Sequence, residues 1–400
     1  MLNAFIYDGI RTPFGRHAGK LAPVRPDDLL AGVMKTVVER NPFKAESIDD
    51  MVIGCGNQGG EDSRCVTRTA GLLAGLPIEL SGFTVQRNCA SGLNAVVSAA
   101  HAITAGEGDL MLVGGVESMS RAPWVMAKAE SPYSRDMRIF DSTIGSRFPN
   151  PRVVAEFGDD AMPQTADNLA KDFSIPRDAC DTFALGSQHK YGIAKGEGFF
   201  TGEITPVSIS KGKKAPPEII SEDEHPRPQT DLASLQKLRA LFEGGVTTAG
   251  NASGVNDGAA VLLVGSLKAG EGAGKKPMAR IISSGVAGVP PRIMGYGPVP
   301  ASKKALDRAG LTIKDMDVIE INEAFAAQVL ACLKGLDVAF DDTRVNMNGG
   351  AIALGHPLGA SGARLALTAA RQLHRTGGRY ALVTLCIGVG QGMAMVIERV

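Results

Sequence analysis

Four short stretches of this 400-residue sequence place a reactive side chain where a predicted strand gives way to a helix or a glycine-rich loop. They contain Cys89, Asn322, His356 and Cys386. A thiol nucleophile, a base that deprotonates it and N–H donors for an oxyanion are the groups that acyl transfer requires. A second cysteine exceeds that requirement, which indicates a separate proton shuttle.

The surroundings of Cys89 predict an activated thiol. Phe83-Thr84-Val85 is typical of the end of a strand, and apolar residues three and four apart over 93–103 predict a helix with one apolar face. Free backbone N–H groups and the helix dipole at such a place favour a thiolate over a thiol. A buried, inert cysteine that caps a turn is the alternative, because free cysteine is among the most buried residue types.

The other three residues are each compatible with an ordinary structural role. Taken alone, Asn322 fits a helix cap, His356 a loop histidine and Cys386 a core residue. The prediction of a catalytic site therefore depends on the whole set, which lies at strand ends, where open α/β sheets place their sites.

The elements that must bring these loops together occur twice along the chain. A strand over 4–7, a helix over 27–38 capped by Asp27 and a strand over 51–53 have counterparts at 279–283, 302–309 and 317–320. Ala360-Ser361-Gly362 matches Ala90-Ser91-Gly92 at an offset of 270 residues. We therefore predict an α/β fold of two βαβαβ-type halves that share a core, so that equivalent loops converge.

The domain boundaries follow from the point at which the regular alternation of predicted strands and helices stops and later resumes. Residues 1–118 form the first half, which 248–270 complete, and 271–400 form the second half. Between them, 119–247 reads as an inserted region rich in loops, with helices near 165–171 and 177–195.

Composition excludes several classes of function. Lys+Arg and Asp+Glu are both 42, which indicates neither a nucleic-acid partner nor an anionic membrane. The six cysteines form no CxxC pair, so we expect no metal site. The first residues lack the pattern of a signal peptide, so we expect a cytoplasmic protein with free thiols. Gly54-Cys55-Gly56-Asn57-Gln58-Gly59 formally matches a dinucleotide-binding loop, but acidic residues follow it where pyrophosphate would bind, which favours a simple turn.

Together the motifs carry a resemblance to a known family. Asn88-Cys89-Ala90-Ser91-Gly92, Asn322-Glu323-Ala324-Phe325, Gly355-His356-Pro357-Leu358-Gly359 and Cys386-Ile387-Gly388-Val389-Gly390 resemble the four signature loops of thiolases. The resemblance covers the whole chain. It implies the thiolase fold, a layered αβαβα core with an insertion in the first half. Ketoacyl synthases share that fold and a nucleophilic cysteine, but Cys386 argues against them.

The resemblance also implies roles for the residues. Cys89 would accept the acyl group as a thioester, and His356 would activate Cys89. With a water held by Asn322, His356 would bind the enolate oxygen, and Cys386 would move the proton at the α-carbon. The N–H groups of Cys89 and Gly388 would form the oxyanion hole. No metal or redox cofactor is required, because CoA and acyl-CoA are substrates and the thioester itself acidifies the α-carbon.

Substrate-binding residues follow from the same resemblance. Ser253 matches the serine that contacts pantetheine, Arg227 matches the arginine near the adenine end, and Ser234 is a further match on that side. Met162 and Met294 match methionines that line the acyl pocket. Ala161 replaces the histidine that precedes the first of these methionines in short-chain biosynthetic thiolases, which argues against a narrow acetoacetyl-CoA role.

The stretches 59–64, 130–136 and 141–151 are similar to those of 3-oxoadipyl-CoA (β-ketoadipyl-CoA) thiolases. A substrate that ends in a carboxylate requires a cation at the far end of its pocket, and Arg147 is one of several basic residues in this region. The alternative is that these basic residues are solvated loop charges or bind the phosphates of CoA. The alternatives are a short-chain acetyl-CoA C-acetyltransferase, a broad 3-ketoacyl-CoA thiolase and, more remotely, a non-catalytic carrier or an NAD-binding oxidoreductase. The family pairs sheet edges into dimers and often forms tetramers through the insertion, so we expect a homodimer or homotetramer.

Overall fold

The computed structural model describes residues 1–212 and 215–400. Ten strands form one sheet, and nine of them run in the order β12-β13-β14-β11-β1-β10-β5-β3-β4, while β2 pairs with β10. The first half contributes β1 (Ala4–Arg11), β2 (Gly15–Arg16), β3 (Asp50–Gly54), β4 (Ser81–Val85), β5 (Leu110–Ser118) and β10 (Asn256–Gly265). The second half contributes β11 (Ala279–Gly288), β12 (Val318–Ile321), β13 (Tyr380–Ile387) and β14 (Gln391–Arg399).

The two half-sheets meet at a short antiparallel contact between β1 and β11, which pairs only three residues of each strand. Alternate residues of the strands face different layers, as the twofold period of a strand requires. In β5, Met111 and Val113 join the core cluster that contains the central helices, whereas Leu110 and Leu112 join the outer cluster. Both faces of the sheet are therefore buried.

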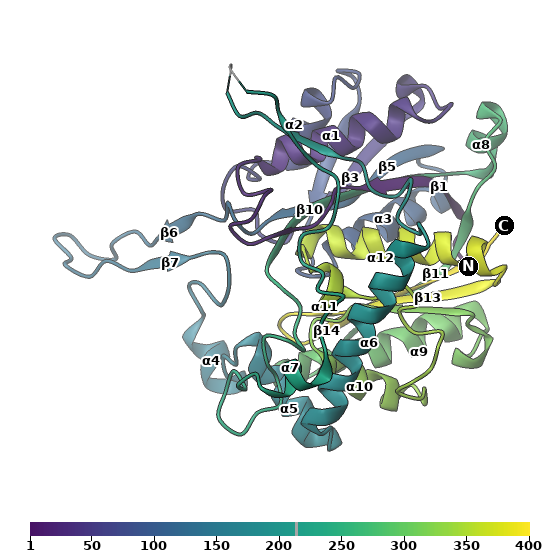
Figure 1. Ribbon diagram of the computed structural model, residues 1–400. Coiled ribbons are helices and arrows are strands. Elements are labelled where there is room, and N and C mark those ends of the chain that lie inside the picture. Colours follow the sequence, from purple (N-terminus) through teal and green to yellow (C-terminus); the bar gives the residue numbers. More distant parts are fainter. Residues whose placement is uncertain (213–214) are drawn as a thin grey trace.

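Helices form the remaining three layers (Figure 1). The helices α1 (Pro26–Glu39) and α2 (Val66–Leu73) cover the outer face of the first half-sheet, and α9 (Pro298–Ala309) and α10 (Ala326–Gly335) cover that of the second. Between the half-sheets lie α3 (Ser91–Ala105) and α12 (Leu358–Thr376), and α12 contacts strands of both halves. This is the αβαβα core that was expected.

The internal repeat is confirmed in detail. β5 begins at Leu110 and β13 at Tyr380, which is the offset of 270 residues seen in the sequence. The order β1-β10-β5-β3 of the first half equals the order β11-β14-β13-β12 of the second. The counterpart of β4 is reduced to one parallel bridge between Ile319 and Val345. The predicted Asp27 cap is wrong: Pro26 already occupies the first helical turn, and Asp27 accepts hydrogen bonds from Arg25 instead.

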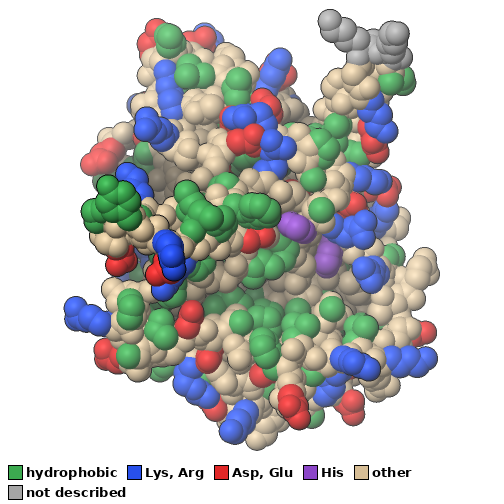
Figure 2. All heavy atoms as spheres, turned by 90° about the vertical axis from the view of Figure 1, so that its left-hand side faces the viewer, with side chains coloured by type: hydrophobic (Ala, Val, Ile, Leu, Met, Phe, Trp, Pro, Cys, Tyr) green, Lys and Arg blue, Asp and Glu red, His purple; other side chains and the backbone are tan. Residues whose placement is uncertain are grey.

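The insertion leaves the core after β5 and re-enters it at β10. It contains β6 (Trp124–Met126), β7 (Ile139–Asp141), α4 (Pro151–Phe157), α5 (Met162–Phe173), α6 (Arg177–Gly196), β8 (Val207–Ile209), β9 (Glu218–Ile220) and α7 (Leu232–Gln236). Both predicted helices therefore occur, as α5 and α6. The β6–β7 hairpin projects from the body, and Figure 2 shows hydrophobic side chains gathered on this projecting region.

Short elements complete the chain. They are α8 (Leu267–Ala273), α11 (Ala351–Leu354) and the 3-10 turns Ala45–Ser47, Pro291–Tyr296 and Ile313–Asp315. Within the described ranges, none of the helices combines the length and apolar character that a membrane crossing demands.

The first turns of α3 and α12 touch through their backbones. A Cβ atom at Gly92 would collide with the carbonyl oxygen of Gly359, and one at Gly359 would collide with the carbonyl oxygens of Val116 and Gly54. Backbone atoms cannot give way as a flexible side chain can. Glycine is therefore required where the loops of the two halves converge.

We predict that Gly92→Ala lowers the free energy of unfolding by at least about 2 kcal/mol, because the added methyl group forces the two helices apart. Gly32→Ala is the matched control: Gly32 is exposed in α1 with nothing within 4 Å of the added atom, so the better helix propensity should add up to about 1 kcal/mol. Urea unfolding of both variants measures the difference. Equal stability of the two variants would contradict the packing argument.

Candidate active site

The loops of the four predicted catalytic residues converge near the first turns of α3 and α12. Nδ2 of Asn322 lies 3.3 Å from Nε2 of His356. The backbone N–H of Gly388 donates to the sulfur of Cys89, and Cys89 is close enough to Cys386 to influence its titration. Asn88 joins the loop of Cys89 to the loop of Cys386, because its Nδ2 donates to the carbonyl of Gly388 at 3.2 Å.

Cys89 is half-buried, and its surroundings oppose the effect of the donors at the helix start. Burial raises the pKa of the Cys89 thiol to about 11, although the N–H groups of Gly388 and Cys89 itself act in the opposite direction. The negative charge of Glu117 raises it further. The helix start therefore supplies donors, but the cost of removing a thiolate from water outweighs them.

His356 is neutral in the free site. Its side chain is buried, and burial, followed by the nearby Arg364 charge, lowers the pKa of His356 to about 3. An uncharged imidazole can accept a proton, whereas an imidazolium cannot. The site thus holds a neutral nucleophile and a neutral base, and charge arises only when a proton moves between them.

Cys386 lies at the end of β13 in an apolar environment. It packs in one cluster with Met294, Ala252, Ala324 and Phe325, and burial raises its pKa well above that of an ordinary thiol. Such a thiol holds its proton until a stronger base is formed beside it. This is the property that a proton shuttle at a carbon atom needs.

The hairpin turn between β13 and β14 positions Gly388 at Cys89. The next residue, Val389, has φ of 68°, a left-handed conformation that is strained for a β-branched residue. The turn is held on the other side by the bond from Asn88 to the Gly388 carbonyl. Strain of this kind persists where the surrounding structure fixes the backbone, and it is concentrated at functional sites.

Asn322 and Glu323 have different roles in their loop. Glu323 points away from the thiols, and its carboxylate accepts hydrogen bonds from Ser187 Oγ (2.6 Å), Asn346 Nδ2 (2.7 Å) and the N–H of Ile352 (3.1 Å). The Glu323 carboxylate therefore fixes the loop. Of these two neighbouring residues, Asn322 is the one that contacts His356. The Oδ1 atom of Asn322 is buried and has no hydrogen-bond partner within the described part of the chain.

Three further polar residues hold the site, and the sequence analysis assigned none of them a role. Asn256 Oδ1 accepts from the backbone N–H of His356 at 2.8 Å, and Ser361 Oγ lies 2.6 Å from Nδ1 of His356. Glu117 accepts from three backbone N–H groups, those of Gly56 (2.9 Å), Asn57 (3.0 Å) and Gly359 (2.8 Å). The available signal was a carboxylate at the end of an otherwise apolar strand, Gly114-Gly115-Val116-Glu117.

Glu117 also belongs to a buried group with Cys55 and Asp62, whose ligand atoms lie within 4.8 Å of one another and could hold a metal ion. Both oxygens of Glu117 already accept backbone hydrogen bonds, and Asp62 accepts from Gly60. Burial raises the pKa of Glu117 to about 7 and also raises that of Asp62. The carboxylates of this group accept hydrogen bonds from the glycine-rich turn at 54–59 and from the residue after it, so they hold the turn in place.

The predicted substrate residues fall into two sets. Met162, Met294 and Ser253 adjoin the catalytic loops: the Met162 sulfur lies beside Gly388, Met294 packs with Cys386, and the N–H of Ser253 donates to Ala324 at 2.9 Å. Arg227 and Ser234 are exposed on the insertion instead. A ligand that reached both sets would have to be long, with one end at the thiols and the other at the surface.

Arg147 differs from the other basic residues of its region. It is half-buried, and its guanidinium donates to Asn57 Oδ1 (2.7 Å) and to the carbonyl of Ser142 (3.2 Å), both uncharged acceptors. Arg121 is instead paired with the carboxylate of Glu61. The remaining basic residues of the region are exposed: Lys128, Arg135, Arg138 and Arg152.

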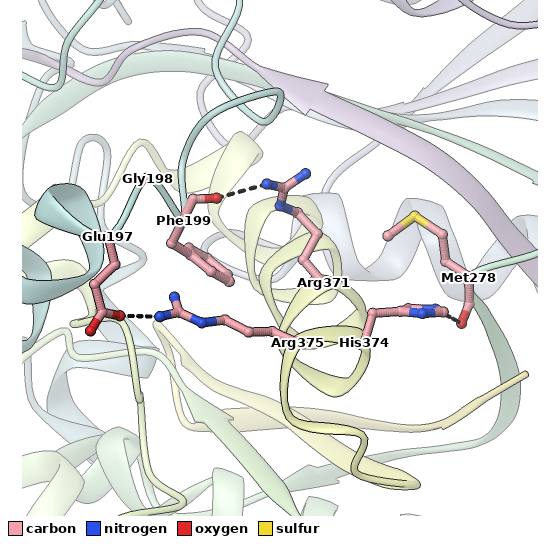
Figure 3. Close-up of a pocket in the computed structure, with 7 residues that line it drawn as sticks. All are labelled: Glu197, Gly198, Phe199, Met278, Arg371, His374 and Arg375. Atoms are coloured by element: carbon pink, nitrogen blue, oxygen red, sulfur yellow. Dashed lines mark hydrogen bonds and ion pairs between the residues drawn. The ribbon is translucent and has the colours of Figure 1, made fainter.

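A separate cavity of about 380 Å³ lies at the far end of α12 (Figure 3). Its basic side chains already have protein partners: Arg371 contacts the carbonyl of Phe199, Arg375 contacts Glu197, and His374 contacts the carbonyl of Met278. These contacts attach the helix to the end of α6. The cavity is therefore part of the scaffold that holds α12, whose other end carries the active site.

Known proteins match this chain over nearly its whole length. The family models for the thiolase N-terminal and C-terminal domains match residues 4–268 and 275–399. The chain is 56% identical over the full length of both proteins to the 3-oxoadipyl-CoA/3-oxo-5,6-dehydrosuberyl-CoA thiolase of Escherichia coli K12, and 54% identical, again over both full lengths, to the β-ketoadipyl-CoA thiolase of Acinetobacter baylyi. The crystal structure of human mitochondrial 3-ketoacyl-CoA thiolase in complex with CoA superposes with a TM-score of 0.91 at 38% identity, covering 100% of this chain and 98% of the other.

We predict that alkylation of Cys89 by iodoacetamide accelerates with pH up to about pH 10 and does not level off near neutrality. With a thiol pKa of about 11, only about one molecule in ten thousand is a thiolate at pH 7. Peptide mapping by mass spectrometry assigns the label, and Cys89→Ala is the control. A rate that becomes constant below pH 8 would show that a stable thiolate–imidazolium pair exists in the free site.

Proposed function

This chain belongs to the thiolase family, and from that premise we propose that it cleaves 3-oxoadipyl-CoA with CoA to give succinyl-CoA and acetyl-CoA. The reverse reaction is a Claisen condensation. The observation that carries the choice of substrate is the full-length identity of 54–56% to relatives with that named activity. Arg147 supports it independently, because a substrate that ends in a carboxylate needs a cation without a carboxylate partner of its own.

In the first half-reaction, His356 takes the proton of Cys89 as the sulfur attacks C3 of the substrate. The tetrahedral oxyanion is stabilised by the N–H groups of Cys89 and Gly388, which the strained turn after Gly388 holds in place. The bond between C2 and C3 then breaks. Succinyl remains on Cys89 as a thioester, and acetyl-CoA leaves as its enolate.

The enolate oxygen is bound by His356 together with a water held by Asn322, whose unpartnered Oδ1 gives such a water an acceptor. Cys386 protonates C2, and its own thiolate then takes the proton of the incoming CoA thiol. The CoA sulfur attacks the succinyl thioester and releases Cys89 as a thiolate, which takes its proton back from His356, so every proton is returned. No metal or redox cofactor enters these steps, because the thioester carbonyl stabilises the carbanion.

We place CoA along the insertion, with pantetheine at Ser253 and the adenine end near Arg227 and Ser234. The acyl chain then lies between Met162 and Met294, beside Cys386. The exposure of Arg227 and Ser234 suits a nucleotide that remains partly in solvent, while the buried loops receive the reacting end.

We also propose a homodimer or homotetramer in the cytoplasm. β4 ends the sheet with a free edge, and Phe83 on it is 45% exposed, so a second copy can extend the sheet there. The projecting β6–β7 hairpin exposes Trp124 and Met126, which supports a further contact between dimers. Six free cysteines suit a reducing compartment.

Our first prediction for this function concerns substrate choice. Purified protein should cleave 3-oxoadipyl-CoA with at least a tenfold higher kcat/KM than acetoacetyl-CoA or a medium-chain 3-ketoacyl-CoA, a difference of about 1.4 kcal/mol in the transition state. CoA-dependent loss of each substrate gives the ratio. Preference for acetoacetyl-CoA would favour a short-chain acetyl-CoA C-acetyltransferase, and equal rates would favour a broad 3-ketoacyl-CoA thiolase.

A second prediction concerns Arg147. Arg147→Gln should lower kcat/KM for 3-oxoadipyl-CoA by roughly ten- to a hundredfold, as expected for the loss of a charge-assisted hydrogen bond worth about 1.5–3 kcal/mol. Acetoacetyl-CoA, which has no distal carboxylate, should be cleaved as before. Arg138→Gln on the exposed hairpin is the matched control. A parallel loss for both substrates would mean that Arg147 serves only to hold Asn57.

A further inference from the structure

The imidazole of His356 is held from both of its nitrogen atoms. Nδ1 lies 2.6 Å from Ser361 Oγ, and Nε2 lies 3.3 Å from Nδ2 of Asn322. Ser361 is completely buried in the second turn of α12, so water does not compete for its hydroxyl group. The positions of the hydrogens on this ring can therefore be worked out from its protein partners.

The hydroxyl of Ser361 has a second contact, 2.8 Å from the carbonyl oxygen of Pro357. That carbonyl also accepts the N–H groups of Ala360 and Ser361. A carbonyl can only accept, and without a hydrogen between them the two oxygen atoms would face each other with lone pairs at 2.8 Å, so the single hydroxyl hydrogen of Ser361 is donated to Pro357. The hydroxyl oxygen must then accept from the imidazole, which requires a hydrogen on Nδ1 of His356. A neutral imidazole has only one such hydrogen, so Nε2 carries a free lone pair.

The contact between Asn322 Nδ2 and His356 Nε2 agrees with this assignment. A lone pair on Nε2 is a suitable acceptor for the Nδ2 hydrogens of Asn322. In the other tautomer, Nε2–H would face these hydrogens, and Ser361 would have to give up its bond to Pro357 to satisfy Nδ1. The backbone adds a third restraint, because Asn256 holds the N–H of His356 at 2.8 Å.

We propose that Ser361 is a positioning residue that fixes His356 as the Nδ1–H tautomer, so that Nε2 presents a lone pair, and not a hydrogen, to a proton donor. The carbonyl of Pro357 orients the Ser361 hydroxyl by accepting its hydrogen. The inference rests on the proposed role of His356 as the base for Cys89. It explains how a buried, neutral histidine is kept ready to accept a proton without any carboxylate beside its Nδ1.

The test combines kinetics with NMR of ¹⁵N-histidine-labelled protein, in which six histidines give few signals. The wild type should show His356 with a protonated Nδ1 and an unprotonated Nε2, assigned by comparison with His356→Ala. Ser361→Ala should lose this pattern in favour of a tautomer mixture or Nε2–H. Its kcat should fall by at least about tenfold with little change in KM, because only the proton transfer is affected.

Ser283→Ala is the matched control, because Ser283 is likewise buried and donates to a backbone carbonyl, that of Ala305 at 2.7 Å, in the outer helix layer. It should share any loss of stability but leave the tautomer and kcat unchanged. Ser361→Thr, which keeps the hydroxyl group, should restore the wild-type tautomer.

Two results would overturn the proposal: an Nε2–H tautomer in the wild type, or an unchanged tautomer in Ser361→Ala. Both are seen without substrate. A failure of the proposed reaction, with no 3-ketoacyl-CoA cleaved by the wild type, is therefore distinguishable from a failure of this inference.

Discussion

The backbone contact between the first turns of α3 and α12 is the constraint on which the site depends. Each helix follows a loop that carries a reactive residue, Cys89 before α3 and His356 before α12. The helices come from different halves of the chain, and glycines at 92 and 359 let them meet without side chains between them. Glu117 reinforces the meeting, because one carboxylate binds N–H groups of the turn at 56–57 and of Gly359. The nucleophile and the base are thus positioned by the same contact that joins the two halves.

Burial sets the chemistry of the site as strongly as it sets the packing. Removing Cys89 and His356 from water moves their pKa values in opposite directions, each toward the neutral form. A pair of this kind is unreactive at rest and gains charge only when a proton passes from sulfur to nitrogen. The donors at Cys89 and Gly388 then act on a developing oxyanion instead of on a permanent thiolate, which concentrates their stabilisation on the transition state.

Much of this could be predicted from the sequence, because it follows from local patterns. The strand-end motifs, the offset of 270 residues and the insertion each leave a regular signal. The pKa of Cys89 could not be predicted, since a sequence indicates both nearby donors and possible burial but not which of the two effects is larger. Ser361, Asn256 and Glu117 were also missed. Their roles arise from contacts across five to 242 residues of sequence, which local patterns do not record. Only Glu117 has a local signal, as a carboxylate at the end of an apolar strand.

In the proposed function, the repeated core carries the reacting groups and the insertion carries several of the predicted contacts to substrate. The reactive groups Cys89, His356, Asn322 and Cys386 all lie on the repeated core, where two half-sheets and two central helices fix their positions. Arg147, Arg227 and Ser234 lie on the insertion, which has no counterpart in the second half. Hydrogen bonds nevertheless join the two regions. Ser187 of the insertion donates to Glu323 in the loop of Asn322. Arg147 donates to Asn57, which is itself bound to Glu117 near Cys89, so a change at either residue can reach the site through the groups that hold it.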